Sequence, residues 1–399
     1  MNIFLLPSWY PSKHNALAGS FTKEQAMMIA QEYESEVNYF VSVNNPCHLT
    51  PRHIKQSIKN FINCKNNEKE VKKVLNNYIE YHWKSFLWTT KIFNGNFNNL
   101  LKNHRDTLEN LLDSGVTIDV IHSHVSYPAG YIAYLLAKEF DIAYVITEHM
   151  GPFPFEGYLK NKKIKQQIEI ALENSAKIIA VSNSLKNEIL TFGIKKEAVV
   201  INNFIDEDIY MYRSPKSKKD KFTFLSVGGT TYQKGIDVLL EAIKNLAYKH
   251  NIEFRIVGDG PQREEYIKLS KDYHISSRVN FIGKLDRVDV VEEFKNCDAF
   301  ILPSRHESFG VVYIEALACG KPIIATKCGG AEDIVNEING KLVDVGNVEQ
   351  LEKAMLEIID NIDSYNEEII KNDFLKRFSK KINTKKYIDL YKEVLTCAE

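Results

Sequence analysis

Two glutamates that stand eight residues apart are the first candidates for chemistry in this sequence. Glu307 and Glu315 lie in the stretch Arg305–Pro322, which reads RHESFGVVYIEALACGKP. The apolar run Ala299–Leu302 predicts a buried strand before this stretch, and the stretch itself predicts an apolar helix that ends at Gly320. Glu307 is therefore expected at the carboxyl end of a strand, where a doubly wound α/β domain binds its ligand.

The start of the predicted helix combines an anion site with the two carboxylates. Ser308 is expected to cap the helix, because its hydroxyl can accept a free N–H of the first turn. The amides of Phe309 and Gly310 open the helix, and free amides at the positive end of a helix dipole bind anions. Glu315 sits among apolar residues, so burial would require hydrogen-bonding partners, and ribose hydroxyls could supply them. If both glutamates were helical, they would be ~12 Å apart, about the reach from a sugar across a diphosphate to a ribose.

A second motif, Leu225–Ala242, has the order of a phosphate-binding loop without the spacing of a Walker motif. A predicted strand ends in Gly228 and Gly229, a polar loop follows, and Lys234 comes just before a predicted helix. Lys234 would neutralise a diphosphate as a point charge. A similar order recurs at Arg255–Glu265, where a simple turn is the more favoured interpretation.

In the first half of the chain, one histidine and one glycine follow predicted strands. His124, in IHSHVSYPAG, comes just after the strand Val120–His122, so a structural role and a role facing the ligand stay equally open. Gly19, in NALAGSF, belongs to the loop after the first strand, where a missing side chain would let the backbone approach a ligand. Both residues are candidates for binding.

Short β-rich runs alternate with amphipathic helical stretches along the chain. The strands and helices that they predict must position all of the candidate site residues. Such alternation is typical of βαβ units with parallel sheets. The loop Arg213–Lys221, RSPKSKKDK, has the composition of a linker. We therefore expect two doubly wound, Rossmann-like α/β domains at 1–205 and 206–375, facing a central cleft, and a terminal segment at 376–399. The predicted strands are Ile3–Leu6, Val37–Val43, Val120–His122, Tyr144–Thr147, Lys177–Val181, Val199–Ile201, Phe222–Val227, Glu253–Val257, Val279–Ile282, Ala299–Leu302 and Pro322–Ala325.

Composition and charge disfavour several classes of protein. The 399 residues are 44% hydrophobic and 26% charged with a net charge of −1, so no overall charge favours nucleic acid as a partner. Six cysteines without a CxxC pair favour a reducing compartment over a disulfide framework. The first residues, MNIFLLPSWYP, lack the features of a signal peptide, and no apolar run approaches the roughly 18 residues of a membrane span. We expect a cytoplasmic protein.

One segment, 51–105, interrupts the pattern. It contains eleven Lys or Arg against three Glu, together with aromatic residues that include Trp83 and Trp88. Two interpretations stay open: a helical insertion with a solvated basic face, and an element that recognises the acceptor or an anionic membrane surface. A second basic run, Lys376–Lys386, favours a terminal helix with a solvated face.

Together these motifs resemble the retaining family-4 glycosyltransferases with the GT-B fold. The resemblance rests on Glu307 and Glu315 with the flanks ILPS and EALACGKPII, on Lys234-Gly235, and on VGDGP, HSH, AVSNSLK and INNFID. The beginning, LPSWYPS with GSFTKEQA, is similar to a bacterial subgroup. The match covers nearly the whole chain except 51–105.

The resemblance implies a role for each candidate. Glu307 would contact hydroxyls of the donor sugar, and Glu315 would hold the ribose hydroxyls. Lys234 and the amides of Phe309 and Gly310 would carry the diphosphate, so no metal would be required. The implied catalytic residues are Glu307, Lys234 and His124, and the implied substrate-binding residues are Gly19, Gly229, Leu285, Ser308, Phe309, Gly310 and Glu315.

The implied activity is transfer of a hexose or N-acetylhexosamine from a nucleoside diphosphate sugar, with UDP favoured, to a carbohydrate or lipid-linked acceptor. His124 would reach the sugar or phosphate from the first domain, and the base would lie against the backbone near Gly283–Leu285. The last helix would cross back onto the first domain. No cofactor is implied, and the enzyme could work at the inner face of the membrane.

One departure from the family pattern concerns the diphosphate. The family commonly has Gly-Arg where this chain has Gly228-Gly229, so Arg305 or another cation would have to substitute. Two alternatives share the expected architecture: a nucleotide-sugar epimerase, and a non-catalytic subunit that binds a donor or a glycan. A dinucleotide-dependent oxidoreductase is disfavoured, because no GxGxxG follows the first strand.

Overall fold

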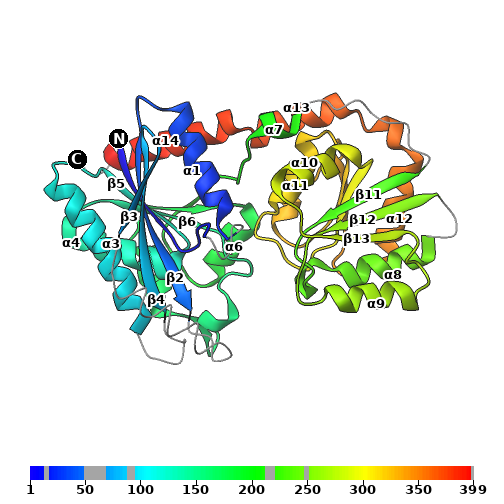
Figure 1. Cartoon of the computed structure of the whole chain (residues 1–399), viewed down its shortest axis with the longest axis horizontal. Coiled ribbons are helices and arrows are strands. Elements are labelled where there is room, and N and C mark those ends of the chain that lie inside the picture. Colours follow the sequence, from blue (N-terminus) through cyan, green and yellow to red (C-terminus); the bar gives the residue numbers. More distant parts are fainter. Residues whose placement is uncertain (13–17, 49–68, 88–94, 212–220, 247–250, 397–399) are drawn as a thin grey trace.

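The computed structural model of the chain describes residues 1–12, 18–48, 69–87, 95–211, 221–246 and 251–396. These residues form two α/β domains, each built on its own mainly parallel sheet (Figure 1). The predicted fold class, two doubly wound parallel-sheet domains, is confirmed.

The first domain holds an eight-stranded sheet in the order β10-β9-β6-β5-β1-β2-β4-β3. Its neighbouring strands are parallel, apart from the pair β3 and β4. The inner strands β5 and β6 are buried on both faces because helices cover both sides of a parallel sheet. The strands are β1 (Asn2–Pro7), β2 (Asn38–His48), β3 (Glu70–Leu75), β4 (Tyr78–Leu87), β5 (Val120–His124), β6 (Tyr144–Glu148), β9 (Lys177–Ala180) and β10 (Ala198–Val200), and the main helices are α1 (Ser20–Glu32), α3 (Gly95–Asp113), α4 (Tyr131–Phe140), α5 (Gln166–Glu173) and α6 (Asn183–Thr191).

The prediction of a helical insertion at 51–105 is wrong for part of that segment. Residues 70–87 form the β-hairpin β3–β4, and β4 extends the sheet beside β2. Tyr78 and Trp83 are 0% and 8% exposed, so these aromatic rings belong to the packed domain rather than to a membrane-facing surface. Trp88 lies outside the described residues.

The second domain holds a six-stranded parallel sheet in the order β13-β12-β11-β14-β15-β16. The last of these strands is missing from the sequence-based prediction, because GKLV begins with a glycine and a lysine and does not form a continuous apolar run. The strands are β11 (Phe222–Val227), β12 (Ile252–Val257), β13 (Val279–Gly283), β14 (Ala299–Leu302), β15 (Ile323–Thr326) and β16 (Gly340–Val343), and the main helices are α8 (Ile236–Leu246), α9 (Arg263–Asp272), α10 (Arg287–Asn296), α11 (Val311–Ala318) and α12 (Val348–Asp360).

The end of the chain returns to the first domain. Helix α13 (Glu367–Phe378) packs in the second domain, and α14 (Lys380–Thr396) then lies beside α1 (Figure 1). Tyr391 of α14 is fully buried, and its hydroxyl lies 3.2 Å from the hydroxyl of Tyr39 in β2. Lys380, from the basic run, binds the Asp206 carboxylate at 2.9 Å. Part of the basic run therefore anchors the crossover.

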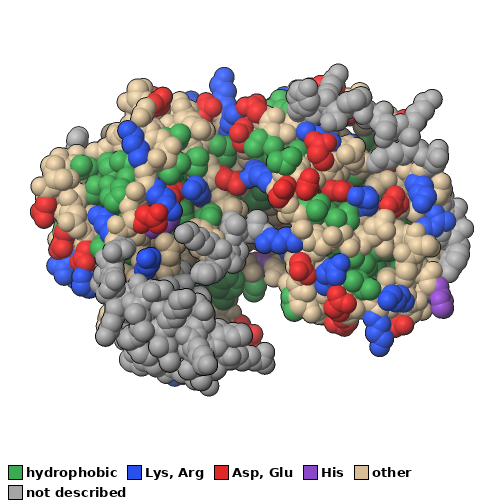
Figure 2. Space-filling model, in the orientation of Figure 1, with side chains coloured by type: hydrophobic (Ala, Val, Ile, Leu, Met, Phe, Trp, Pro, Cys, Tyr) green, Lys and Arg blue, Asp and Glu red, His purple; other side chains and the backbone are tan. Residues whose placement is uncertain are grey.

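The surface carries charges of both signs. On the face drawn in Figure 2, basic and acidic side chains are interspersed over the described parts of both domains. Within the described ranges, no helix combines the length and the apolar character needed to cross a bilayer.

Candidate active site

The carboxyl ends of β11 and β14 meet where the strand order of the second sheet reverses. From β11 the sheet continues to β12 on one side, and from β14 it continues to β15 on the other side. Loops that leave two such strands run apart, and a ligand commonly binds between them. Lys234 ends the short helix η4 (Tyr232–Lys234) after β11, and Glu307 follows β14.

Glu307 is nearly buried and hydrogen-bonded on both its side chain and its backbone. It is 8% exposed, and its Oε1 accepts hydrogen bonds from Lys234 Nζ at 2.6 Å and from Ser304 Oγ at 2.7 Å. Its N–H donates to the Cys328 carbonyl at 3.0 Å, and its carbonyl accepts from the Gly330 N–H at 2.8 Å. The structure therefore brings two of the predicted catalytic residues into direct contact.

Gly235 allows Lys234 to reach Glu307. Its φ is 66°, and a β-carbon at this position would lie 2.0 Å from the carbonyl oxygen of Pro303. Both facts require glycine, because other residues rarely adopt a positive φ and any side chain would collide with the loop after β14. The close approach of the two loops is thus encoded by one residue beside the lysine.

Arg305, the cation expected to substitute for the missing arginine, forms an ion pair with Asp237. Its terminal nitrogens bind the two oxygens of Asp237 at 2.8 and 2.6 Å, a bidentate geometry that fixes a guanidinium firmly. Its guanidinium also lies 3.8 Å from the centroid of the Tyr232 ring. Gly229 has no positive φ, and a β-carbon there would meet its nearest neighbours at 3.7 Å. The backbone therefore tolerates a side chain at 229, so the fold alone does not explain this glycine.

Helix α11 begins later than the sequence predicts. Its N-cap is Gly310, at a φ of 94°, and no side chain caps it, so the prediction that Ser308 caps the helix is wrong. A β-carbon on Gly310 would lie 2.5 Å from the Tyr313 ring, which explains the glycine. Since Glu307 lies outside the helix, the helical rise does not give its distance from Glu315. The amides at 309 and 310 still precede the positive end of α11.

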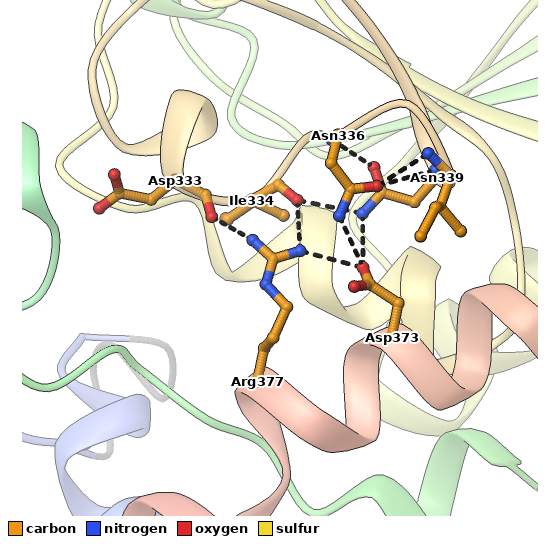
Figure 3. Close-up of polar contacts among 7 residues, drawn as sticks. Asp333, Ile334, Asn336, Asn339, Asp373 and Arg377 are labelled. Atoms are coloured by element: carbon orange, nitrogen blue, oxygen red, sulfur yellow. Dashed lines mark hydrogen bonds and ion pairs between the residues drawn. The ribbon is translucent and has the colours of Figure 1, made fainter.

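A polar network supports the segment that carries Phe309. The short helix η5 (Gly330–Asp333) packs against it, since a β-carbon on Gly330 would lie 2.2 Å from the Phe309 Cα. Arg377 of α13 donates to the Asp333 carbonyl and, at 3.0 Å, to the Ile334 carbonyl (Figure 3).

The same arginine binds the carboxylate of Asp373 at 3.0 Å (Figure 3). Asn336 and Asn339 donate to that carboxylate at 3.1 and 2.9 Å. Helix α13 therefore holds the segment from Asp333 to Asn339, which follows the short helix that packs against Phe309. Helix α13 itself lies far from Phe309 in the sequence.

Glu315 is half-buried and receives a hydrogen bond from a tyrosine. Tyr210, in α7 (Glu207–Met211), donates its hydroxyl to Glu315 Oε1 at 2.6 Å. Burial raises the pKa of Glu315 to about 7, while the bond from Tyr210 and the positive charge of Arg287 oppose the rise. Arg287, at the start of α10, forms an ion pair with Glu24 of α1. The ribose-binding role of Glu315 stays a prediction. In the chain by itself, the half-buried carboxylate receives its hydrogen bond from Tyr210.

Two other predicted binding residues have clear local positions. Leu285 is half-buried and comes between β13 and Asp286, which caps α10. Gly19 caps α1 at a φ of 63°, and a β-carbon there would lie 2.1 Å from the Trp9 carbonyl oxygen. Packing of the loop after β1 therefore explains Gly19, and its contact with a ligand stays a prediction.

His124 lies in a stack of histidines at the carboxyl ends of β5 and β6. It is 4% exposed, its Nδ1 lies 2.9 Å from Nε2 of His149, and the two rings stack at 5.1 Å. Burial lowers the pKa of His124 to about 3, so the imidazole is neutral at physiological pH. The ring of His122 also packs against His124, tilted by 34° with 4.5 Å between the ring centroids.

His149 is the residue that the sequence analysis missed. It directly follows β6 as His124 ends β5, and that equivalence was the signal available in the sequence. Its ring is 7% exposed, and its Nδ1 has no hydrogen-bond partner among the described residues. Phe21 of α1 packs against the ring at 4.7 Å. This nitrogen is therefore buried and unsatisfied within the described residues.

The two domains touch at the segment that carries Glu307. The Ser182 hydroxyl donates to the Ser308 carbonyl at 2.6 Å, and His306 Nε2 lies 2.9 Å from a carboxylate oxygen of Glu188 in α6. The N–H of Asn183 donates to the Asp333 carboxylate at 2.5 Å. The amino end of α6 in the first domain therefore holds the candidate donor-binding loop of the second domain.

Known proteins share both the sequence and the fold of this chain. The family model described as glycosyl transferases group 1 matches residues 211–376, and the model described as glycosyltransferase family 4 matches residues 81–209. An uncharacterized glycosyltransferase of Methanocaldococcus jannaschii is 33% identical over 275 residues, which are 68% of this chain and 73% of that protein.

Two solved structures have similar folds. Sucrose-phosphate synthase of Thermosynechococcus elongatus is similar over 100% of both chains, with a TM-score of 0.76 and 17% identity. Anabaena HepE in complex with UDP is similar over 98% of this chain and 100% of that chain, with a TM-score of 0.70 and 18% identity.

Proposed function

The chain belongs to the glycosyltransferases of group 1 and family 4, and we propose that it moves a hexose or an N-acetylhexosamine from a UDP-sugar to a glycan or lipid-linked glycan, with retention at the anomeric carbon. UDP is supported by the similar fold of HepE, whose complex contains UDP. The donor binds the second domain between the loops after β11 and β14, and the acceptor approaches from the first domain.

The contact between Lys234 and Glu307 carries this proposal. The ammonium and the carboxylate lie 2.6 Å apart at the switch point of the sheet and neutralise each other. A diphosphate offers Lys234 a stronger counter-charge, so donor binding would draw the lysine away. Glu307 would then be released to accept hydrogen bonds from hydroxyls of the sugar. One ion pair thus links recognition of the diphosphate to recognition of the sugar.

The remaining donor contacts come from the loops after β11, β13 and β14 and from α11. The amides of Phe309 and Gly310, at the positive end of α11, bind the diphosphate. Glu315 accepts from the ribose hydroxyls with the oxygen that Tyr210 does not occupy. The base lies along the backbone near Leu285, and Gly229 leaves room for the diphosphate.

The first domain supplies two neutral histidines. A neutral imidazole can both donate and accept a hydrogen bond, so the unpaired Nδ1 of His149 can contact the sugar while His124 holds its Nε2. Because this nitrogen is buried in the chain without a ligand, the contact requires the side chains over it, Phe21 among them, to move when the donor binds. His124 is then a positioning residue, and His149 is the one that touches the substrate. This changes the direct role that the family resemblance implies for His124.

The chemical step is governed by stabilisation of the leaving group. The bond between the anomeric carbon and the diphosphate breaks, and charge develops on the phosphate oxygen next to Lys234 and the start of α11. The acceptor hydroxyl attacks from the same face, and its proton passes to the released UDP. These positive groups make transfer independent of a metal ion. A covalent sugar adduct trapped on a carboxylate of the first domain would contradict same-face attack.

A thermal-shift screen across nucleotide sugars tests the donor. A ligand at 100 times its dissociation constant stabilises a protein by about 2.7 kcal/mol, so the matching UDP-sugar should raise the melting temperature clearly. The shift should be lost in Lys234→Ala and kept in the control Lys268→Ala, an exposed lysine on α9. Equal shifts in both variants would place the diphosphate elsewhere.

Product analysis without an acceptor separates transfer from epimerisation. A transferase releases the sugar slowly by hydrolysis, with unchanged configuration at the other carbons. An epimerase would return an altered nucleotide sugar or free epimerised sugar, and that product would overturn the proposal.

A further inference from the structure

A row of aromatic rings lies on the side of the first domain where its strands end. Consecutive rings in this row are 5.8, 6.3, 5.4 and 6.1 Å apart between centroids. The rings are half-buried and come from the loops after β1, β5 and β6 and from α3. In spatial order the aromatic row consists of Trp9, Phe155, Tyr158, Tyr127 and Phe97.

Lys165 lies over the aromatic row and has no acidic partner among the described residues. Lys165 Nζ is 3.6 Å from the centroid of the Tyr127 ring and 5.8 Å from that of Tyr158. Lys165 is half-buried, and burial lowers the pKa of its ammonium. None of the ion pairs among the described residues includes Lys165. A desolvated cation on an aromatic face is a place where an anion is favoured.

The hairpin that leads to this lysine carries three more lysines at unfavourable positions. Strands β7 (Leu159–Lys160) and β8 (Lys163–Ile164) place Lys160 directly opposite Lys163, and like charges across a strand pair repel each other. The two-residue loop between them has φ values of 51° at Asn161 and 62° at Lys162. Glycine is the usual residue at the second position of such a loop, so a lysine there costs backbone free energy.

Together these lysines form a positively charged surface beside the aromatic row. We name residues 159–165 the basic hairpin. Its like-charged pair, its strained lysine and its desolvated lysine all cost free energy in the chain by itself, and anionic groups bound at the hairpin would lower the two electrostatic costs. Flat aromatic rings beside a cation suit a sugar ring that stacks while a charged substituent reaches the lysines.

We propose that the aromatic row and the basic hairpin bind an anionic glycan acceptor, with sugar rings on the aromatic row and a phosphate or carboxylate substituent at Lys162 and Lys165. This proposal rests on the proposed function and names the class of its acceptor. The segment from His149 to Phe155 connects the histidine pair directly to the aromatic row. A membrane surface fits less well, because the rings are half-buried within the domain.

Replacing Lys162 with glycine separates binding from folding. Glycine relieves the positive φ, so Lys162→Gly should keep or raise the melting temperature of the full chain. Loss of one cationic contact should nevertheless weaken binding of an anionic glycan about tenfold. Lys165→Met, which keeps the length of the stem, should weaken binding as well. Lys195→Ala, an exposed lysine before β10 at the opposite end of the sheet, serves as the control and should change nothing.

Isothermal titration with trigalacturonate and maltotriose is the direct measurement. The proposal expects trigalacturonate to bind, maltotriose to bind at least about tenfold more weakly, and the difference to shrink as salt is added. Equal binding of the two sugars, no binding of trigalacturonate at millimolar concentration, or unchanged binding in Lys162→Gly would overturn it. Binding of inorganic pyrophosphate with the same loss in Lys162→Gly, but without trigalacturonate binding, would also overturn the glycan assignment.

Two further measurements keep this proposal separate from the donor assignment. Co-sedimentation with phosphatidylglycerol vesicles that Lys162→Gly abolishes, in the absence of trigalacturonate binding, would assign the surface to membranes instead. The thermal shift caused by a UDP-sugar should be the same in Lys162→Gly and in the parent chain. If no UDP-sugar raised the melting temperature of the parent chain, the proposed function would be contradicted. The titration with trigalacturonate would still test the anion site.

Discussion

Replacing Tyr210 with phenylalanine should change how donor binding depends on pH. The substitution removes only the hydroxyl that donates to Glu315 Oε1 at 2.6 Å. Tyr210 is 2% exposed and packs on Phe294, contacts that a phenylalanine ring keeps. The carboxylate would then lose a donor that favours its charged form, so its pKa must rise.

The size of the effect follows from the free energy of that bond. A hydrogen bond to a charged group contributes about 1.5–3 kcal/mol, and one pKa unit corresponds to about 1.36 kcal/mol. Glu315 is only half-buried, so solvent screening favours the lower end, and its pKa should rise by about one unit from about 7. At pH 7 the charged fraction would fall from about a half to about a tenth. The KM for the donor should therefore rise about fivefold.

Steady-state kinetics between pH 6 and pH 9.5 measure this shift. The donor KM of Tyr210→Phe should exceed that of the parent chain near neutral pH and converge with it near pH 9.5, where both carboxylates are charged. Arg287 and Glu24, the other charged groups that affect Glu315, are present in both the parent chain and the variant, so the comparison isolates the tyrosine hydroxyl. Tyr266→Phe, which removes a hydroxyl bonded to Gln262, should leave the profile unchanged. A KM ratio independent of pH would refute the reasoning.

Four further predictions follow from the same contacts. Glu307→Ala should abolish transfer while UDP affinity, measured by titration, stays within about threefold; unchanged turnover would remove Glu307 from the mechanism. Gly235→Ala should destabilise the chain by at least about 2 kcal/mol in denaturant unfolding, because its β-carbon meets a carbonyl, and a smaller loss would contradict the close loop contact. Arg377→Ala should cost about 2–3 kcal/mol of unfolding free energy, because the Asp333 carbonyl loses its donor and the Ile334 carbonyl and the Asp373 carboxylate each lose one of theirs, whereas Lys376→Ala should cost little. The raised pKa of Glu315 favours the folded state fully below pH 4.5, and this contribution is lost as the pH rises toward 7, so Glu315→Gln should flatten the fall in stability over that range.

Much of the fold was predictable because parallel strands are short apolar runs with helices between them. The range Phe222–Val227 agrees with β11 residue for residue, and most other strands differ at one or both ends. The hairpin at 70–87 was not predicted, because its lysines suggested a solvated helix. The alternation YIEYHW, which buries Tyr78 and Glu80 on one face, was the available signal.

The candidate site was predictable by residue type but not by contact. Lys234 and Glu307 each follow a predicted strand, yet only the order of strands in the sheet places the two loops side by side. Ser308 has the chemistry of a helix cap, but a positive φ at Gly310 moves the start of the helix. Local sequence rules do not detect that move, because the collision that requires it involves the Tyr313 ring one turn later.

The sequence by itself determined the class of fold, the two acidic positions around α11 and the lysine before α8. These are properties of short segments, and short segments carry their own periodicity and turn chemistry. Only the tertiary structure decided which residues become partners: Lys234 with Glu307, Tyr210 with Glu315, and His124 with His149. The first two pairs join residues 73 and 105 positions apart, and chain folding rather than local pattern sets such distances. These partners and burial also decide that Glu307 is paired with a lysine, that the imidazole of His124 is neutral, and that the pKa of Glu315 is raised.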